Sequence, residues 1–123
     1  GTREIEEAVQ AHAGIAEVAV VGVADSLKGQ VPVAFAVAKD GARTATKELA
    51  AAFEKEVMAT VDRELGAIAR PSRVHFVTVL PKTRSGKLLR RSIQALCEGR
   101  DPGDLTTIED PGALEQIRNA LKG

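Results

Sequence analysis

Aromatic residues and cysteine are scarce in this chain of 123 residues. It has three Phe, no Tyr and no Trp, and its single cysteine is Cys97. Proteins that bind single-stranded nucleic acid stack bases on aromatic side chains, so this scarcity counts against that class. One cysteine excludes an internal disulfide and a zinc site built from cysteines. We expect Cys97 to pack in the core.

Long apolar runs and a signal peptide are also missing. No run approaches the roughly 20 residues that a membrane-spanning helix needs, and the first residues lack the pattern of a secretory signal. The composition, 44% hydrophobic and 28% charged, is that of a globular domain. We expect one domain over residues 1–123, in a reducing, cytoplasmic setting and without a membrane partner. Because the sequence enters a helix with no lead-in, we expect a fragment of a longer protein.

Positive charge is concentrated in one segment. The chain has 17 basic residues (Lys and Arg together) and 17 acidic residues (Asp and Glu together). Pro81–Arg91 nevertheless holds five basic residues and no acidic one. The rest of the chain therefore carries 12 basic and 17 acidic residues. Clustered charge raises the local electrostatic potential whatever the net charge is, which favours an anionic partner. The alternative is an ordinary solvated face.

Lys87 is the residue of interest in this segment. Ser85-Gly86 followed by apolar residues at helical spacing predicts a turn into an amphipathic helix, with Ser85 as N-cap. Lys87 would lie in the first turn, where the helix dipole disfavours a cation but where an anionic ligand is attracted. A P-loop is rejected, because Pro81 and Leu88 stand where that motif needs glycine and a hydroxyl. A lysine that meets a phosphate or carboxylate remains the hypothesis.

Three runs rich in valine predict the strands of a small sheet. Residues 16–24 are too apolar to be half exposed and predict a central strand. Residues 31–39 follow after the turn-forming loop 25–30, which predicts antiparallel pairing. A long amphipathic helix over 46–65 then precedes a third strand over 73–79. Such a crossover should place the third strand parallel to an earlier one.

The remaining segments complete an α+β domain. Residues 3–12 predict a first helix, residues 99–110 read as a loop, and Asp110 is expected to cap a last helix. His12 and His75 have no neighbours in the sequence that would complete a metal site, and His75 is expected to point outward from its strand. The predicted fold is a small three-stranded mixed sheet with helices packed on it.

Four motifs occur in the order and spacing of one family. They are Thr2–Glu7, Val20–Gly29, Glu64–Pro71 and, most specific, Pro-Lys-Thr-Arg-Ser-Gly-Lys at residues 81–87 followed by two arginines. The chain resembles the C-terminal domain of AMP-forming acyl-CoA synthetases, in the adenylate-forming superfamily, from Gly1 to Leu96. Its tail is similar to the acetate and propionate branch, within which the resemblance favours propionate–CoA ligase.

The resemblance implies a ligase that works in two steps with Mg-bound ATP and coenzyme A. A carboxylate attacks the α-phosphate of ATP, which gives an acyl-adenylate and diphosphate, and coenzyme A then displaces AMP. ATP, acid and most catalytic groups would lie on an N-terminal adenylation domain that this chain lacks, together with the hinge. The small domain would rotate between the steps. By itself it is expected to be inactive and to hold no ligand.

The family's site residues carry over to named positions. Lys87 matches the catalytic lysine that bridges the carboxylate and the nucleotide during adenylation. Ser85 and Gly86 would shape the turn that delivers it, whereas Arg90 and Arg91 would face the partner domain or solvent. In the family this lysine is also reversibly acylated by a protein lysine acyltransferase and freed by a sirtuin-type deacylase. Acylation removes the charge and should stop adenylation.

A second group of residues is implied for the thioester step. The loop around Asp25, Lys28 and Gly29 would then lie nearer the nucleotide. Acetate-type relatives place a basic residue for the coenzyme A 3′-phosphate just before the Glu-Leu-Gly motif. Asp62 fills that position here and Arg63 stands beside it, so Arg63 is the candidate for this contact. The alternative to the ligase hypothesis is a free-standing module that binds anions or nucleic acid through Lys82–Arg91.

Overall fold

The structure is a computed structural model that describes residues 1–123. Its strands and α-helices follow one another along the chain as α1 (Thr2–Gln10), β1 (Ile15–Asp25), β2 (Gly29–Ala38), α2 (Lys47–Leu65), β3 (Arg73–Phe76), α3 (Arg90–Cys97) and α4 (Gly112–Lys122). Two short 3-10 helices, Gly41–Thr44 and Ala67–Ala69, flank α2. None of the helices combines the length and apolar character needed to cross a membrane.

The three strands form one mixed sheet in the order β1-β2-β3. β1 pairs with β2 in antiparallel fashion and β2 with β3 in parallel, so Ala34 lies between Val20 and Val74. The predicted mixed sheet with one crossover is confirmed. β3 is shorter than predicted. The Val77 N–H still donates to the Ala36 carbonyl (2.9 Å), but the Thr78 N–H donates to the Gln116 side chain instead (2.7 Å).

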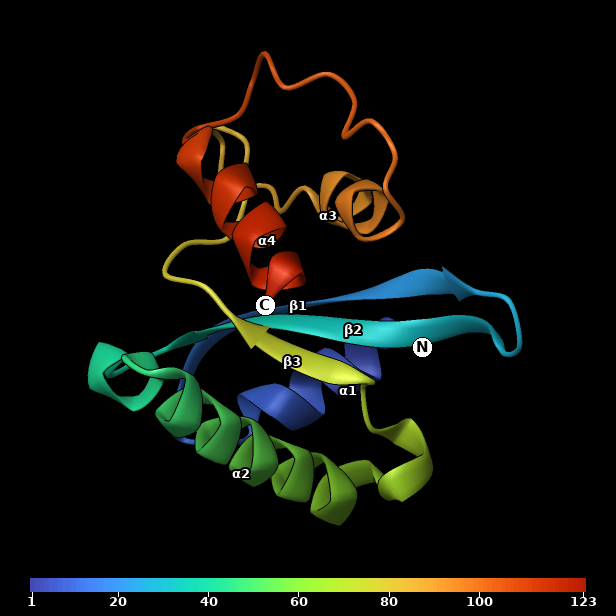
Figure 1. The fold of residues 1–123 in the computed structure, drawn as a ribbon, viewed down its shortest axis with the longest axis vertical. Coiled ribbons are helices and arrows are strands. Elements are labelled where there is room, and N and C mark those ends of the chain that lie inside the picture. The colour runs from blue at the N-terminus through green and yellow to red at the C-terminus, as the bar shows by residue number, and fades with distance from the viewer.

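Helices cover both faces of the sheet. Figure 1 shows α1 and α2 beneath it and α3 and α4 above it. Strand β2 serves the two layers differently: Ala34 and Ala36 face α1 and α2, where their small size leaves room for Phe53, whereas Phe35 faces α3 and α4. All four side chains are almost completely buried. The alternation of large and small residues therefore fills two cores with one strand.

Strand β1 is an edge strand, so its predicted central position is wrong. Its apolar run has a different cause, because helices bury both of its faces. Side chains also close its free edge. Glu6 of α1 accepts a hydrogen bond from the Val20 N–H (2.8 Å) and Glu98, just after α3, accepts one from the Ala24 N–H (2.7 Å). Closing an edge in this way prevents pairing with other chains.

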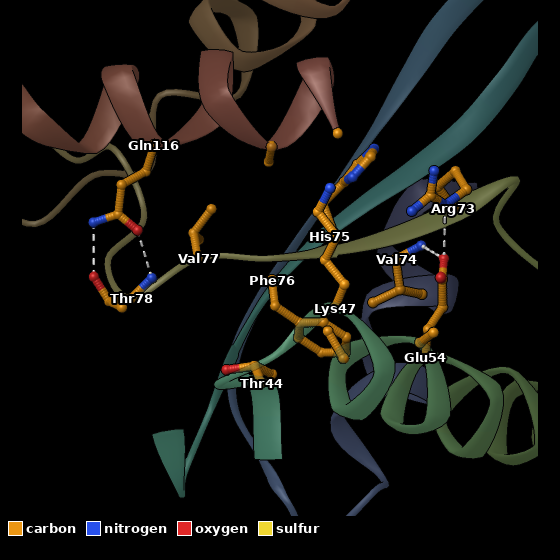
Figure 2. A pocket seen from close by; sticks show the side chains of 14 residues that line it. Thr44, Lys47, Glu54, Arg73, Val74, His75, Phe76, Val77, Thr78 and Gln116 are labelled. Carbon is orange, nitrogen blue, oxygen red and sulfur yellow. Dashed lines mark hydrogen bonds and ion pairs between the residues drawn. The ribbon is translucent and has the colours of Figure 1, made fainter. Parts of the chain in front are cut away.

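The opposite edge, β3, is closed by the same device. Glu54 of α2 accepts a hydrogen bond from the Val74 N–H and Gln116 of α4 accepts one from the Thr78 N–H, both at 2.7 Å. Figure 2 shows Glu54 reaching the strand from one helix layer, and Gln116 reaching Thr78, two residues past the end of the strand, from the other. A polar residue on each of several helices is thus used to satisfy the sheet backbone rather than to bind a ligand.

The two ends of α2 carry capping residues, whereas the start of α4 differs from the prediction. The Thr46 hydroxyl accepts a hydrogen bond from the Leu49 N–H (3.1 Å) at the start of α2, and Gly66, with a φ of 91°, ends that helix. α4 begins at Gly112 with Pro111 as its N-cap, so the expected N-cap role of Asp110 is wrong, although the Asp110 carboxylate accepts the Gly112 N–H (2.9 Å). Cys97 is half buried among apolar side chains, as expected, and burial raises the pKa of its thiol to about 11.

Candidate active-site loop

The segment from Pro81 to Leu89 is a hairpin and not a turn into a helix. Lys82 and Leu88 form an antiparallel bridge. The Thr83 N–H donates to the Lys87 carbonyl (2.8 Å), and the Leu89 N–H donates to the Pro81 carbonyl (3.0 Å). Lys87 therefore stands on the returning arm of the hairpin, close to its tip.

The predicted N-cap role of Ser85 is wrong, and with it the placement of Lys87 in a helical first turn. Helix α3 begins only at Arg90. The Gly86 N–H donates to the Thr83 carbonyl (2.8 Å), and Gly86 has a φ of 90°, which turns the chain back toward Lys82. A positive φ of this size is strained for any residue with a Cβ. The expected roles of Ser85 and Gly86 in the turn agree with their position at the tip.

Thr83 organises this hairpin with its side chain as well as its backbone. Its hydroxyl oxygen accepts a hydrogen bond from the Lys87 N–H (3.0 Å) and lies 3.0 Å from the Ser85 hydroxyl. Thr83 thus contacts both backbone groups of Lys87, since its N–H also donates to the Lys87 carbonyl (2.8 Å). The backbone of Lys87 is held on both sides, while its side chain is exposed.

The tail of the chain supports the hairpin, a contact that the sequence did not predict. Thr83 forms an antiparallel bridge with Ile108. The Arg84 N–H donates to the Thr107 carbonyl (3.0 Å) and the Glu109 N–H donates to the Lys82 carbonyl (2.9 Å). Ile108 is 6% exposed and anchors this part of the tail. A single bridge leaves no periodic pattern in a sequence, and the signal available was that Ile108 is an aliphatic residue inside a polar stretch.

Acidic residues neutralise two of the five cations in the segment Pro81–Arg91. Lys82 forms an ion pair with Glu17, and Arg90 forms one with Glu6 (2.8 Å). The expectation that Arg90 faces a partner or solvent is therefore wrong, whereas Arg91 is exposed as expected. The cations that remain exposed and without an ion pair are Arg84, Lys87 and Arg91.

The second predicted group of residues lies elsewhere. Asp25 accepts a hydrogen bond from the Leu27 N–H (2.9 Å) in the β1–β2 turn, where Gly29 has a φ of 82° and Lys28 is exposed without an ion pair. In Figure 1 this turn lies at the far right, whereas the hairpin lies above the sheet beside the start of α4. The structure therefore does not bring these residues to Lys87.

Arg63 and its neighbours are at the end of α2. Arg63 is exposed and donates to the Thr60 hydroxyl (3.3 Å). Asp62, which stands where acetate-type relatives carry a basic residue, forms an ion pair with Arg70, with 2.9 Å between Oδ1 and Nε. Arg63 and Arg70 thus place two guanidinium groups near this helix end, and Asp62 compensates one of them.

The histidines have structural surroundings. His12 accepts a hydrogen bond from the Gly14 N–H (2.9 Å) and lies 3.3 Å from a Glu56 oxygen. His75 lies on the opposite face of β3 from Val74 and Phe76, but its expected outward orientation is wrong, because it is partly buried and stacks on the Phe35 ring with 5.1 Å between centroids. Burial lowers its pKa, and the nearby Arg73 lowers it further. No three His, Cys, Asp or Glu side chains are close enough to hold a metal ion.

A groove of about 460 Å³ lies along β3 between α2 and α4, and Figure 2 shows its lining. Lys47, Arg73 and His75 contribute polar groups to it. Its lining includes none of the predicted site residues, and Glu54 already pairs with Arg73 (3.0 Å). The candidate site is therefore the exposed hairpin and not this groove. A hairpin can supply one group to a site whose other walls belong to another domain.

Comparison with known proteins places the chain in a family. The family described as the AMP-binding enzyme C-terminal domain matches residues 4–87, a span that ends at Lys87. A propionate–CoA ligase of Escherichia coli (strain K12) is 60% identical over 122 residues, which make up 99% of this chain and 19% of that protein. An acetyl-coenzyme A synthetase of Pyrobaculum arsenaticum is 48% identical over 122 residues, 99% of this chain and 18% of that protein.

A solved structure agrees. The crystal structure of an acyl-CoA synthetase of Brucella canis matches with a TM-score of 0.58 and 36% identity, over 72% of this chain and 15% of that one. The resemblance seen in the motifs and the predicted fold class are confirmed. The chain spans about a fifth of the length of the two curated relatives. It belongs to the AMP-binding enzyme C-terminal domain family.

Proposed function

We propose that this chain is the mobile C-terminal domain of an AMP-forming acid–CoA ligase. The whole enzyme would convert a short-chain carboxylic acid, ATP and coenzyme A into acyl-CoA, AMP and diphosphate. An N-terminal adenylation domain would hold most of the ATP, its Mg²⁺ and the acid. The higher identity to a propionate–CoA ligase (60%) than to an acetyl-coenzyme A synthetase (48%) favours propionate as the acid.

One observation carries this proposal: Lys87 is the lysine of the hairpin whose charge is not compensated. Lys82, five residues earlier, is paired with Glu17, whereas the Lys87 side chain is exposed and has no ion pair. Its backbone is fixed by hydrogen bonds to Thr83 on both sides. A fixed backbone with a free ammonium group suits a residue that must enter a site formed by another domain.

The chemistry of adenylation needs such a cation. The carboxylate and the α-phosphate of ATP are both anionic, so they repel each other as they approach. An ammonium group placed between them offsets this repulsion and stabilises the negative charge that grows in the transition state. Lys87 would therefore be the catalytic residue that this domain supplies for the first step.

The second step would use the other end of the domain. After rotation, the β1–β2 turn with Asp25, Lys28 and Gly29 would approach the nucleotide. Lys28 is exposed and unpaired, as a residue that meets a phosphate should be. Arg63 at the end of α2 would contact the coenzyme A 3′-phosphate. Its positive charge is available for this contact, because the neighbouring Asp62 is paired with Arg70. The turn and the hairpin are well separated in Figure 1, which supports the proposal that one part of the domain serves adenylation and another serves thioester formation.

Lys87 would also be the acylation site. Its exposed side chain at the end of a hairpin is open to a protein lysine acyltransferase, and a sirtuin-type deacylase would restore the amine. Acylation removes the charge and therefore the electrostatic contribution to adenylation.

The alternative of a nucleic-acid-binding patch over Lys82–Arg91 has less charge available than the sequence indicated, because Lys82 and Arg90 are paired within the domain.

Thr83→Val should lower the rate of adenylation about fivefold in the full-length ligase. Valine keeps the branched shape but cannot accept the hydrogen bond from the Lys87 N–H, and one such bond contributes about 1 kcal/mol. Thr83→Ser restores the acceptor and should regain most of the rate. Thr107→Val is the matched control, because Thr107 contacts the hairpin only through its carbonyl. Equal rates for Thr83→Val and wild type would contradict the positioning by this hydroxyl.

The proposed function is tested by ATP–diphosphate exchange in the full-length ligase that carries this chain. Exchange should depend on added acid, with propionate giving the highest kcat/KM and acetate a lower value. Exchange without any acid, or binding of RNA with an affinity that falls steeply with salt, would favour the alternative. Mass spectrometry after incubation with acyltransferase and acyl-CoA would show whether Lys87 is the modified residue.

A further inference from the structure

The carboxylate of Glu6 joins three elements of the domain. Glu6 belongs to α1, its Oε2 accepts a hydrogen bond from the Val20 N–H of β1 (2.8 Å), and both of its oxygens accept hydrogen bonds from Arg90 at the start of α3. The distances to Arg90 are 3.0 Å from Nε and 2.8 Å from Nη2. The Glu6 side chain is only 12% exposed. A bidentate pair of this kind fixes direction as well as distance.

Arg90 connects this junction to the hairpin. It follows Lys87 by three residues and is the first residue of α3, directly after Leu89, whose N–H closes the hairpin on Pro81 (3.0 Å). A cation at a helix start is disfavoured by the helix dipole, so this arginine depends on its carboxylate partner. The hydrogen bond to Glu6 raises the pKa of Arg90, which reflects the same attraction.

We propose that Glu6 is a positioning residue for Lys87, acting through Arg90. The inference rests on the proposed role of Lys87 in adenylation. Glu6 fixes the returning arm of the hairpin relative to the sheet, and thereby fixes where the Lys87 ammonium group enters the site. The hairpin's other arm is held separately by the pair of Lys82 and Glu17. Loss of Glu6 should therefore displace Lys87 while the sheet and the β1–β2 turn stay in place.

The variant that tests this is Glu6→Gln in the full-length ligase. Glutamine keeps the length and one oxygen that can accept the Val20 N–H, but it loses the charge and the second acceptor for Arg90. Because small displacements of a catalytic group are costly, adenylation should fall by about tenfold or more. The KM for ATP and the rate of thioester formation from preformed acyl-adenylate should stay within twofold of wild type. Glu7→Gln is the matched control, since Glu7 is on the same helix, exposed and without a partner.

A double-mutant cycle separates positioning from general damage. If Glu6 acts through Lys87, adding Glu6→Gln to Lys87→Ala should cause no further loss of adenylation. Arg90→Lys is a second route to the same answer, because it keeps the charge but loses the two-bond fork. It should show the same selective loss, with thermal melting confirming that both variants fold.

Three results would overturn the inference: wild-type adenylation in Glu6→Gln, an equal fall of both half-reactions, or a further loss on the Lys87→Ala background. Failure of the proposed function itself would look different. In that case Lys87→Ala alone would leave adenylation intact, and the positioning role of Glu6 would be refuted together with the role of Lys87.

Discussion

Lys87→Ala should lower acid-dependent ATP–diphosphate exchange by about 10²–10³-fold in the full-length ligase, the loss typical when one electrostatic contact to a transition state is removed. The structure gives the reason for so large an effect. Lys87 is exposed and unpaired at the end of a hairpin whose backbone is fixed by Thr83. No neighbouring lysine can replace it, because Lys82 is paired with Glu17. The measurement is the initial rate of exchange at saturating ATP and acid.

Two arginines of the same segment are the controls for charge alone. Arg84 and Arg91 are exposed and unpaired like Lys87, so Arg84→Ala and Arg91→Ala each remove one positive charge from the same surface. If Lys87 acts by position, these variants should keep exchange within about threefold of wild type, the range of a screened surface charge. A similar fall in all three variants would show that only the summed charge matters.

Phe35→Ala should lower the free energy of unfolding of this chain by about 3–5 kcal/mol, the usual cost of deleting a buried aromatic ring. Phe35 is fully buried in the middle of β2 and faces α3 and α4. Its ring also stacks on His75 (5.1 Å). Domains of this size are stable by only about 5–15 kcal/mol, so a large part of the stability should disappear. Urea unfolding followed by circular dichroism gives the value.

Leu27→Ala provides the comparison for an exposed apolar residue. The Leu27 side chain is 92% exposed in the β1–β2 turn, so its removal should change the free energy of unfolding by less than about 0.5 kcal/mol. Equal losses for Phe35→Ala and Leu27→Ala would mean that the core between the sheet and α3 and α4, in which Phe35 lies, does not form.

Periodicity was enough to predict most of the fold. The valines and alanines that alternate in β2, and the apolar stripe through Phe53 and Val57 in α2, reflect burial that repeats with the period of the element. The predicted central position of β1 was wrong because a strand with helices on both faces is apolar along its whole length, whether it lies in the middle of the sheet or at its edge. Side chains such as Glu6 and Glu98 close its edge, and no pattern along the sequence predicts such contacts between distant residues.

The site was predicted in part. The motif around residues 81–87 indicated Lys87, and its exposed place in the hairpin agrees with that role. Ser85 was expected to cap a helix because a serine before an amphipathic stretch usually does so. The chain forms a hairpin there instead. Hydrogen bonds join Thr83 to Lys87, and a bridge joins Thr83 to Ile108. The partners of Lys82 and Arg90 lie more than 60 residues away in sequence, beyond the reach of any local signal.

The most direct test of the account is the second half-reaction of Lys87→Ala. Given preformed acyl-adenylate and coenzyme A, this variant of the full-length ligase should form the thioester at the wild-type rate, since in our proposal the β1–β2 turn and not the hairpin would serve that step. A loss of thioester formation as large as the loss of diphosphate exchange would contradict the division of the domain into two working faces.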